Sequence, residues 1–239
     1  MEKEISVIVP AFNEAVCIEK NILALEDFLR CNFSSHEIIV SEDDSTDGTD
    51  RILRKLSAKS ADIIHLHSDM KLGKGKAISN AILSSQSKNI FLTDADFPAD
   101  MECITQMTGL LDRYDMVLGS RLKKGGKAKR SFLRSFLSLS YNSLVRLAFR
   151  TGISDHQCGV KAFRRDSLAK LIPEVRSLGF FWDTELIVMA RKRDYRIAEV
   201  PLTWKDRNKG KSKVSVLKES YRMGKDTAKL WYRINLWKA

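Results

Sequence analysis

Short apolar runs alternate with helix-like hydrophobic patterns through the first half of the chain. Runs of aliphatic side chains predict strands at residues 5–9, 37–40, 63–66, 90–93 and 116–118. Between these runs, apolar positions recur every three or four residues, which predicts helices near residues 18–29, 50–59, 76–84 and 101–112. Pro10 is placed to close the first strand and Asn13 to cap the first helix. This alternation is typical of an α/β fold with a parallel sheet and right-handed crossovers.

The second half of the chain is less regular. Apolar helical patterns cover residues 131–150 and 183–192, residues 195–203 have the composition of a strand, and residues 216–237 form an amphipathic helical pattern. Residues 121–130 and 206–213 are rich in lysine, arginine and glycine, so we expect basic loops at both places.

Charge is distributed unevenly between the two halves. The chain has 239 residues, of which 44% are hydrophobic and 30% charged, a composition typical of folded globular proteins. Its formal net charge is +11, but residues 1–120 hold 12 basic and 20 acidic side chains, whereas residues 121–239 hold 29 basic and 10 acidic. This split argues against a uniformly basic surface for nucleic acid. The second half is instead suited to an anionic surface or ligand.

The cysteines and the apolar segments indicate in which cellular compartment the protein is expected and whether it spans a membrane. The four cysteines form no CxxC pair, which argues against a zinc ribbon or a disulfide scaffold and fits a reducing compartment. The first residues lack the pattern of a signal peptide. No apolar window reaches the roughly 18 uncharged residues of a spanning helix, so we do not expect an integral membrane protein.

The sharpest candidate for chemistry is the acidic pair Asp94 and Asp96, directly after the fourth predicted strand. Ligands of parallel sheets bind beyond the carboxyl ends of the strands. Side chains two positions apart on an extended segment point the same way, so the two carboxylates should converge and need a cation between them. Hard oxygen ligands favour Mg²⁺ or Mn²⁺, shared with the phosphates of a nucleotide. The alternative is an ordinary pair of acids at a helix N-terminus.

Two further turns at the same predicted edge are acidic or polar. The second strand is followed by EDDSTDGT at 42–49, and the first ends in VPAFNE at 9–14. Each segment alone is compatible with an ordinary turn or helix cap. Together they indicate acidic groups that could accept hydrogen bonds from a nucleotide base while a metal binds its phosphates.

In order and spacing, VIVPAFNEA, EDDSTDGT, LGKGKA and LTDADFP resemble the family 2 glycosyltransferases, whose GT-A fold is a Rossmann-like, nucleotide-sugar-binding α/β fold. Later segments resemble the polyprenol-phosphate (dolichol-phosphate) hexosyltransferases: GSR at 119–121, DHQCGVKAFRRD at 155–166, FFWDTEL at 180–186 and AEVPLTWKDRNKGKSK at 198–213. The resemblance implies a mostly parallel central sheet and a helical, basic C-terminal part. It implies a catalytic domain over residues 1–214 and an amphipathic helix over 215–239, packed on the domain or at a membrane surface.

The resemblance also implies roles for individual residues. Asp94 and Asp96 correspond to ligands of the metal and the diphosphate, and Asp43 to the carboxylate that contacts the base. Arg121 is expected to act on the phosphates, and Asp183 and Glu185 to orient the acceptor or the sugar hydroxyls, although both also fit the first turn of a helix. Further residues expected to contact the donor or the phosphates are Pro10, Ala11, Asn13, Glu14, Lys74, Lys76, Ala95, Arg207 and Lys213.

The reaction implied by the resemblance is metal-dependent, inverting transfer of a hexose from GDP-mannose or UDP-glucose to dolichyl or polyprenyl phosphate. A lipid monophosphate is already anionic at neutral pH and needs no strong protein base. QCG at 157–159 and MGKD at 223–226 are similar to segments of dolichyl-phosphate glucosyltransferases and lean towards glucose. Basic loops and the aromatic residues of the last helix fit a peripheral protein on the cytoplasmic face of a membrane.

Other interpretations stay open. A related glycosyltransferase acting on a non-lipid glycan would share these motifs, whereas a sugar nucleotidyltransferase would need a glycine-rich phosphate loop where this chain has AFNEA. A non-enzymatic membrane-binding or nucleic-acid-binding module is disfavoured by the acidic first half. GKGKA at 73–77 lacks the spacing of a P-loop. His65 and His67 alternate along a strand with no third ligand nearby, so we expect no metal there, and Cys158 is interpreted as a packed residue.

Overall fold

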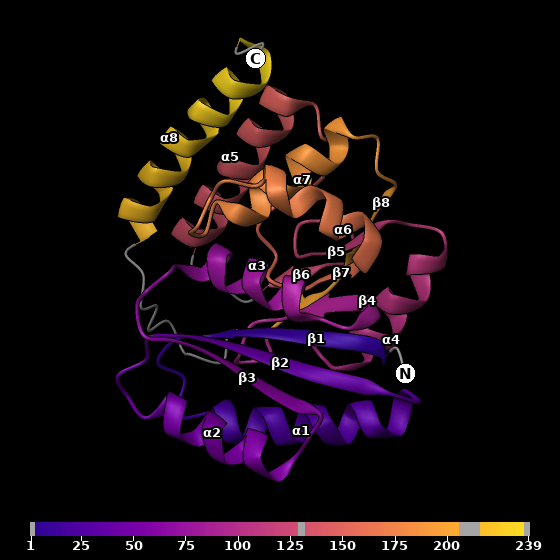
Figure 1. Ribbon diagram of the computed structural model, residues 1–239. Helices are drawn as coiled ribbons and strands as arrows, with labels where there is room; N and C mark the ends of the chain where they lie inside the picture. The colour runs from indigo at the N-terminus through magenta and orange to yellow at the C-terminus, as the bar shows by residue number, and fades with distance from the viewer. Residues whose placement is uncertain (1–2, 129–131, 206–215, 237–239) are drawn as a thin grey trace.

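A seven-stranded, mostly parallel sheet forms the centre of the computed structural model, which describes residues 3–128, 132–205 and 216–236 (Figure 1). The strand order is β3-β2-β1-β4-β7-β5-β8. These strands are β1 (Lys3–Ala11), β2 (His36–Asp43), β3 (Ile63–Ser68), β4 (Ser87–Leu92), β5 (Met116–Ser120), β7 (Lys161–Arg164) and β8 (Ile197–Pro201). Two short strands, β6 (Lys127–Ala128) and β9 (Thr203–Trp204), form a separate parallel pair.

Helices cover both faces of the sheet. In Figure 1, α1 and α2 lie below it, and α3, α6 and α7 lie above it. The helices are α1 (Ile18–Asn32), α2 (Thr49–Lys59), α3 (Lys74–Ser84), α4 (Glu102–Gly109), α5 (Phe132–Phe149), α6 (Arg165–Leu171), α7 (Trp182–Lys192) and α8 (Val216–Asn235). Two 3₁₀ turns, η1 (Leu110–Asp112) and η2 (Ile172–Glu174), follow α4 and α6.

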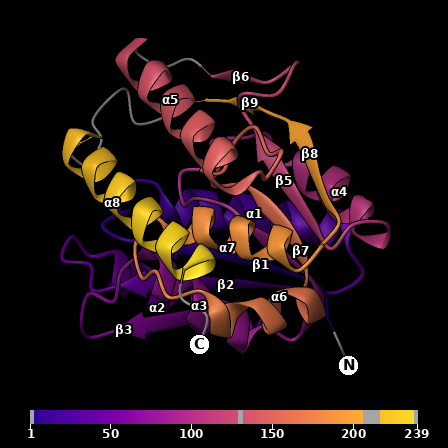
Figure 2. The same cartoon turned by 90° about the horizontal axis from the view of Figure 1, so that it is seen from above.

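Alternation of side chains along the strands produces two separate cores. On β1, Val7 and Val9 enter the core shared with α1, whereas Ile8 enters the core shared with α3 and α7. A third, smaller cluster joins α5, α7 and α8 through Val145, Val188 and Leu230. Figures 1 and 2 accordingly show α5 and α8 on the same side of the sheet as α7.

Parallel pairing is confirmed for the predicted strands of the first half. β1 pairs in parallel with β2 and β4, β2 with β3, and β5 with β8. The sequence did not predict β7, which lies antiparallel between β4 and β5. This strand matters because it brings residues 159–161 to the middle of the sheet, next to the end of β4.

Two local predictions were wrong. The first strand does not close at Pro10, because Pro10 lies opposite Ser41 and the pairing continues to Ala11. Asn13 does not cap the first helix, which begins five residues after it at Ile18, and the N–H groups of Cys17 and Ile18 donate to the Glu14 carbonyl. Asn13 instead has a positive φ of 56°, a left-handed conformation that asparagine tolerates.

Candidate active site

The acidic pair lies in a tight turn at the carboxyl edge of β4. The prediction of an extended segment was wrong, because the Phe97 N–H donates to the Asp94 carbonyl at 3.0 Å and Phe97 has a φ of 45°. Ala95 and Phe97 are buried, while Asp94 and Asp96 are only partly covered. Asn21 on α1 fixes the turn by donating to the Ala95 carbonyl at 2.8 Å. The turn therefore presents the two acids away from the core.

A lysine supplies the positive charge that the acidic pair requires. The Lys74 ammonium, at the start of α3, lies 2.6 Å from the Asp94 carboxylate, and the two side chains are 24% and 28% exposed. Burial alone would lower the pKa of Lys74, but Asp94, with Asp183 and Asp96 further off, raises it above its ordinary value. Three carboxylates, two from the turn after β4 and one from α7, thus act on one ammonium group.

Asp94 is held in its ionised form by the same arrangement. Burial alone would raise the pKa of the Asp94 carboxyl, but Lys74, Lys161 and Arg121 together hold it below its ordinary value. Lys76, which was predicted to act beside Lys74, has an exposed side chain one half-turn further along α3. The structure therefore brings Lys74 to the acidic turn and points Lys76 to solvent.

The segment before β7 packs directly against the Asp94 side chain. A Cβ added at Gly159 would overlap the Asp94 carboxylate, so only glycine leaves room for that side chain. Two residues later, the fully buried Lys161 ammonium donates to the Asp183 carboxylate at 2.7 Å and to the Cys158 carbonyl. The QCGVK segment is thus a close support for the acidic turn. The sequence motif identified this segment, but it did not predict that Gly159 and Lys161 are the residues that contact the acids.

Replacing Gly159 with alanine is expected to reduce turnover roughly a hundredfold, about 3 kcal/mol of transition-state stabilisation. The new Cβ would force the Asp94 carboxylate to move, while the buried surface stays nearly the same. Gly109→Ala is the matched control, because no atom lies within 4 Å of a Cβ there. Steady-state kinetics and urea unfolding of both variants would test this. Equal activity of the two variants would contradict it.

Arg121 is a buried residue with fixed partners, although it begins the segment that was predicted to be a basic loop. Its guanidinium donates to both carboxylate oxygens of Asp155 at 2.7 and 2.8 Å and lies over the Trp204 ring at 5.0 Å. Burial would raise the pKa of Asp155, but the guanidinium holds it below its ordinary value. Arg121 also contributes to the field at Asp94. It therefore acts on the site from a set position.

His156, next to Asp155, is a buried neutral imidazole. Its ring Nδ1 donates to the Asn142 Oδ1, which also accepts the His156 backbone N–H, and its Nε2 accepts from the Thr151 hydroxyl. Burial lowers the pKa of His156 to about 4. Since an unfolded histidine has a pKa near 6.5, the unfolded chain binds a proton between these two values and the folded chain does not.

Stability is therefore expected to fall as pH falls from about 6.5 to about 4. From pH 7 to pH 5 this single group should cost about 2 kcal/mol of unfolding free energy. Urea unfolding at the two pH values would measure the loss, and His156→Gln should show a smaller loss. The same pH dependence in the variant and the native protein would contradict the assignment.

The residues expected around the base form a second, adjacent group. Asp43, at the end of β2, accepts from the Leu72 and Gly73 N–H groups at 2.6 and 3.0 Å, so its carboxylate ties the loop before α3 to the sheet. Asn13 and Glu14 are bound to the turn after β2. The Asn13 N–H donates to the Ser45 hydroxyl at 2.9 Å, and the Glu14 N–H to the Thr49 hydroxyl at 2.8 Å.

The remaining residues that were predicted to contact the donor or the phosphates are Pro10, Ala11, Arg207 and Lys213. Pro10 is half-buried, and the Ala11 side chain packs in the core. Arg207 and Lys213 lie outside the described residues.

The two acids of α7 have different surroundings. Asp183 faces Lys161 and the acidic turn. Glu185 accepts from the Arg176 and Ser177 N–H groups at 3.1 and 2.8 Å and from the Arg233 guanidinium at 2.6 Å. The structure therefore does not bring Glu185 to Asp94. Glu185 anchors α8 and the loop before α7, while Asp183 stays with the acidic turn.

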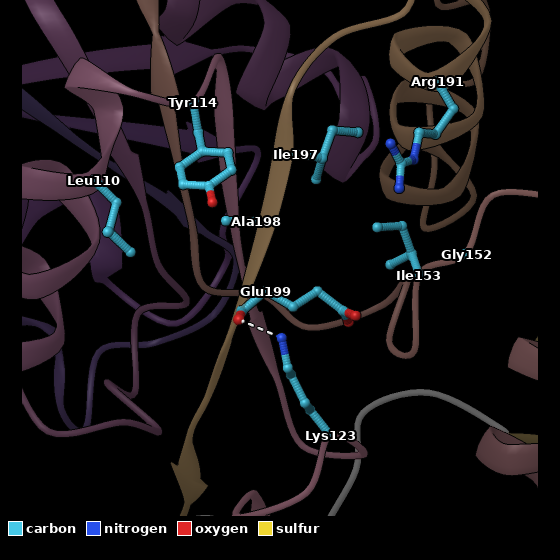
Figure 3. A pocket seen from close by; sticks show the side chains of 9 residues that line it. All are labelled: Leu110, Tyr114, Lys123, Gly152, Ile153, Arg191, Ile197, Ala198 and Glu199. Atoms are coloured by element: carbon cyan, nitrogen blue, oxygen red, sulfur yellow. Dashed lines mark hydrogen bonds between the residues drawn. The ribbon is translucent and has the colours of Figure 1, made fainter.

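A pocket of about 430 Å³ lies elsewhere, beside β8 (Figure 3). Its walls include Tyr114, Arg191 and Glu199, and the Lys123 ammonium donates to the Glu199 carbonyl at its rim at 2.9 Å. None of the predicted site residues lines it. One of its lining residues, Glu199, accepts through its carboxylate from the N–H of Asp155, the partner of Arg121.

Sequence comparison decides the family. The family described as Glycosyl transferase family 2 matches residues 6–172. The chain belongs to glycosyltransferase family 2. This confirms the family expected from the motifs.

Several curated proteins are similar to this chain over nearly its whole length. Glycosyltransferase AglD of Haloferax volcanii is 35% identical over 98% of this chain and 38% of its own length. Dolichyl-phosphate beta-glucosyltransferase ALG5C of Trichomonas vaginalis is 31% identical over 96% of this chain and 72% of its own. The Dictyostelium discoideum protein named dolichyl-phosphate beta-glucosyltransferase is 30% identical, with 98% and 76% covered. The chain thus spans well under half of AglD and about three quarters of the other two.

Solved structures confirm the GT-A fold. Glucosyl-3-phosphoglycerate synthase from Mycobacterium tuberculosis, in complex with Mn²⁺, UDP and glucosyl-3-phosphoglycerate, superposes with a TM-score of 0.70 at 18% identity, covering 96% of this chain and 79% of that one. Mannosyl-3-phosphoglycerate synthase from Rubrobacter xylanophilus gives 0.70 at 16%, covering 97% and 74%. At these identities the likeness supports the fold alone.

Proposed function

We propose that this chain transfers glucose from UDP-glucose to dolichyl or polyprenyl phosphate, with inversion at the anomeric carbon. An oxygen of the lipid phosphate would attack C1 of the sugar, and the bond from C1 to the nucleoside diphosphate would break. The observation that carries the proposal is the ion pair of Lys74 with Asp94 at the carboxyl edge of the sheet, where the charges of Asp96 and Asp183 also act on the Lys74 ammonium. The names of two relatives at 30% and 31% identity support the lipid acceptor and the choice of glucose.

The acidic turn fits a divalent cation. A cationic group, the Lys74 ammonium, already sits 2.6 Å from the Asp94 carboxylate, and oxygen ligands of this kind suit Mg²⁺ or Mn²⁺. Asp94 and Asp96 would hold the ion, which when bound neutralises charge on the diphosphate leaving group.

The other residues would bind and position the donor and the acceptor. Lys74, paired with Asp94, would move to a phosphate oxygen, and the Arg121 guanidinium, held by Asp155, would add positive potential. Asp43 and the turn that holds Asn13 would bind the base. Asp183, oriented by Lys161, would accept from a sugar hydroxyl. The acceptor phosphate is anionic at neutral pH, so its oxygen attacks without a protein base.

The acceptor would lie in a membrane, and two helices offer apolar faces to it. Exposed apolar side chains on α5 include Phe136, Leu139 and Leu147. On α8, Trp231 and Tyr232 are exposed, whereas Leu230 packs with α5 and α7. None of the described helices is long and apolar enough to cross a membrane. We propose that residues 215–239 pack on the catalytic domain and rest with α5 on the cytoplasmic membrane surface.

Sedimentation with lipid vesicles tests this proposal. The Leu139→Glu variant should bind the vesicles more weakly than the Leu83→Glu variant, in which the substituted leucine lies on α3 and is exposed to a similar extent.

Transfer of labelled sugar from a panel of nucleotide sugars to dolichyl phosphate tests the function. We expect labelled product in the organic phase with UDP-glucose, and its loss with EDTA that excess Mg²⁺ or Mn²⁺ restores. Transfer from GDP-mannose alone would overturn the choice of sugar. Label that stays in the aqueous phase on a glycan would overturn the choice of acceptor.

A further inference from the structure

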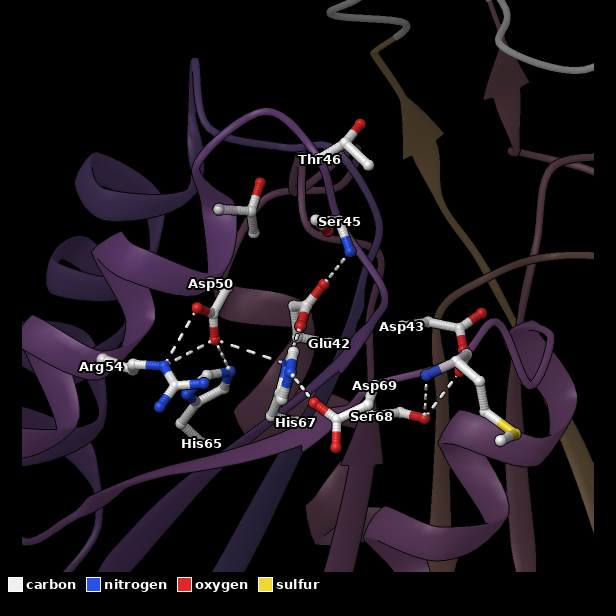
Figure 4. Close-up of polar contacts among 12 residues, drawn as sticks. Glu42, Asp43, Ser45, Thr46, Asp50, Arg54, His65, His67, Ser68 and Asp69 are labelled. Atoms are coloured by element: carbon white, nitrogen blue, oxygen red, sulfur yellow. Dashed lines mark hydrogen bonds and ion pairs between the residues drawn. The ribbon is translucent and has the colours of Figure 1, made fainter.

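Four side chains with metal-ligating atoms gather on the α2 side of the sheet, away from the acidic turn (Figure 4). They are Glu42 at the end of β2, Asp50 in the first turn of α2, and His65 and His67 on β3. Each offers one ligand atom, and all of these atoms lie within 4.8 Å of one another. The expectation that the two histidines have no third ligand nearby was wrong.

Sheet register explains the gathering. β2 and β3 pair in parallel with Glu42 opposite His67, so these two side chains leave the same face of the sheet. His65 lies two positions before His67 and points to the same face. Asp50 then reaches this face from α2, which packs over it.

The distances are close to those of a metal coordination shell. Asp50 Oδ1 lies 3.8 Å from His65 Nε2 and 3.4 Å from His67 Nδ1. His67 Nδ1 lies 2.5 Å from Glu42 Oε2. Ligand atoms at bond lengths of about 2.0–2.2 Å around a tetrahedral ion are about 3.3–3.6 Å apart. Shifts of roughly an ångström in the side chains would therefore complete the shell.

His65 has a buried nitrogen that needs a partner. Its side chain is 6% exposed, and its Nε2, which faces Asp50, has no hydrogen-bond partner among the residues that the structure describes. Buried polar atoms rarely remain without a partner, and such an atom calls for an explanation. A metal ion between His65 and Asp50 would supply that partner.

The other ligands are oriented from outside, as metal ligands commonly are. His67 turns its Nδ1 to the cluster and its Nε2 to the Asp69 carboxylate, 3.1 Å away. The second oxygen of Glu42 accepts from the Ser45 N–H, and the Arg54 guanidinium lies 2.9 Å from Asp50. A carboxylate on the far nitrogen of a histidine is a frequent second shell of zinc sites.

We propose that Glu42, Asp50, His65 and His67 bind a Zn²⁺-type transition-metal ion at a site separate from Asp94 and Asp96. Two imidazole nitrogens favour zinc and its neighbours over Mg²⁺, which prefers oxygen ligands. The ion would join the end of β2 to α2 and β3, and so stabilise the turn that also holds Asn13 and Glu14. The proposal does not depend on which sugar or acceptor the protein uses.

Calorimetric titration of the EDTA-stripped full-length protein with Zn²⁺, in excess Mg²⁺, tests the site. We expect one Zn²⁺ per chain in the native protein and in the Asp94→Asn/Asp96→Asn variant, and none in His65→Gln/His67→Gln. Bound Co²⁺ should give the intense visible absorption of tetrahedral coordination. Absence of binding to the native protein, or binding that Asp94→Asn/Asp96→Asn abolishes, would overturn the proposal.

Two single variants separate ligation from effects on folding. Asp69 is 99% exposed, so Asp69→Asn should fold normally yet weaken Zn²⁺ binding about 10–100-fold through its effect on His67. His36 is a buried histidine that also has an unpartnered Nε2 among the described residues but lies outside the cluster, so His36→Gln should bind Zn²⁺ like the native protein. Unchanged affinity in Asp69→Asn together with lost affinity in His36→Gln would contradict the assigned ligands.

Discussion

Replacing Asp94 with asparagine is expected to lower the turnover of sugar transfer about a thousandfold, equivalent to about 4 kcal/mol. Asparagine keeps the shape of the side chain but removes the charge that holds Lys74 and would hold the divalent ion. Loss of that cation leaves the charge of the departing diphosphate without its main stabilisation, which is commonly a large term in such reactions. Single-turnover and steady-state rates at saturating Mg²⁺ or Mn²⁺ would measure the effect.

Asp100→Asn is the matched control for this change. Asp100 lies in the same segment, six residues after Asp94, and forms an exposed ion pair with Lys205 at 2.6 Å. Its loss should leave turnover nearly unchanged and cost at most about 1 kcal/mol of stability. If Asp94→Asn retained a tenth of the native turnover while folding normally, the acidic turn would not be the catalytic centre.

Hydrophobic patterning was sufficient to predict the first half of the sheet. The runs at β1, β2 and β4 are buried on both faces, as strands inside a parallel sheet are, and their continuous apolar character identifies them. β7 escaped prediction because its first residue is Lys161, whose burial depends on Asp183, 22 residues further along the chain. A four-residue strand that begins with a charged side chain has no periodicity that marks it.

The candidate site was predictable where its residues are close in sequence. Asp94 and Asp96 are marked by their own spacing and by the strand before them, but the partner of Asp94 lies 20 residues away at Lys74. The basic segment after β5 predicts a basic loop. Only the fold shows that the first residue of this segment, Arg121, is buried in an ion pair with Asp155. Such partners depend on strand order, which a local pattern does not contain.

Helix geometry could have separated Asp183 from Glu185. Residues two positions apart on a helix point to nearly opposite sides, so both carboxylates of one first turn do not reach the same ligand. The structure accordingly turns Asp183 to Lys161 and Glu185 to Arg233. The motif therefore holds two acids whose surroundings differ, and the expected role of each needs its own test.

Replacing Lys161 with methionine is expected to destabilise the fold by about 3–5 kcal/mol. Methionine keeps the unbranched shape of the side chain and is one atom shorter, but the Asp183 carboxylate, 9% exposed, loses the ammonium that lies 2.7 Å from it in the native protein. An unpaired buried carboxylate is costly because it has left water without gaining a partner. Urea unfolding would measure the loss, with little change in the denaturant slope.

A double-mutant cycle distinguishes the ion pair from simple loss of packing. Lys161→Met/Asp183→Asn removes both charges, so it should recover much of the stability that Lys161→Met loses. Lys205→Met, which breaks a pair that is more than half exposed on both sides, should cost no more than about 1 kcal/mol. Additive losses in the double variant would contradict the coupling, because they would mean that Lys161 contributes through packing alone. If stability recovered but turnover did not, transfer would require at least one of the two charges for a reason other than the stability of the fold, since Lys161 also helps to hold Asp94 in its ionised form.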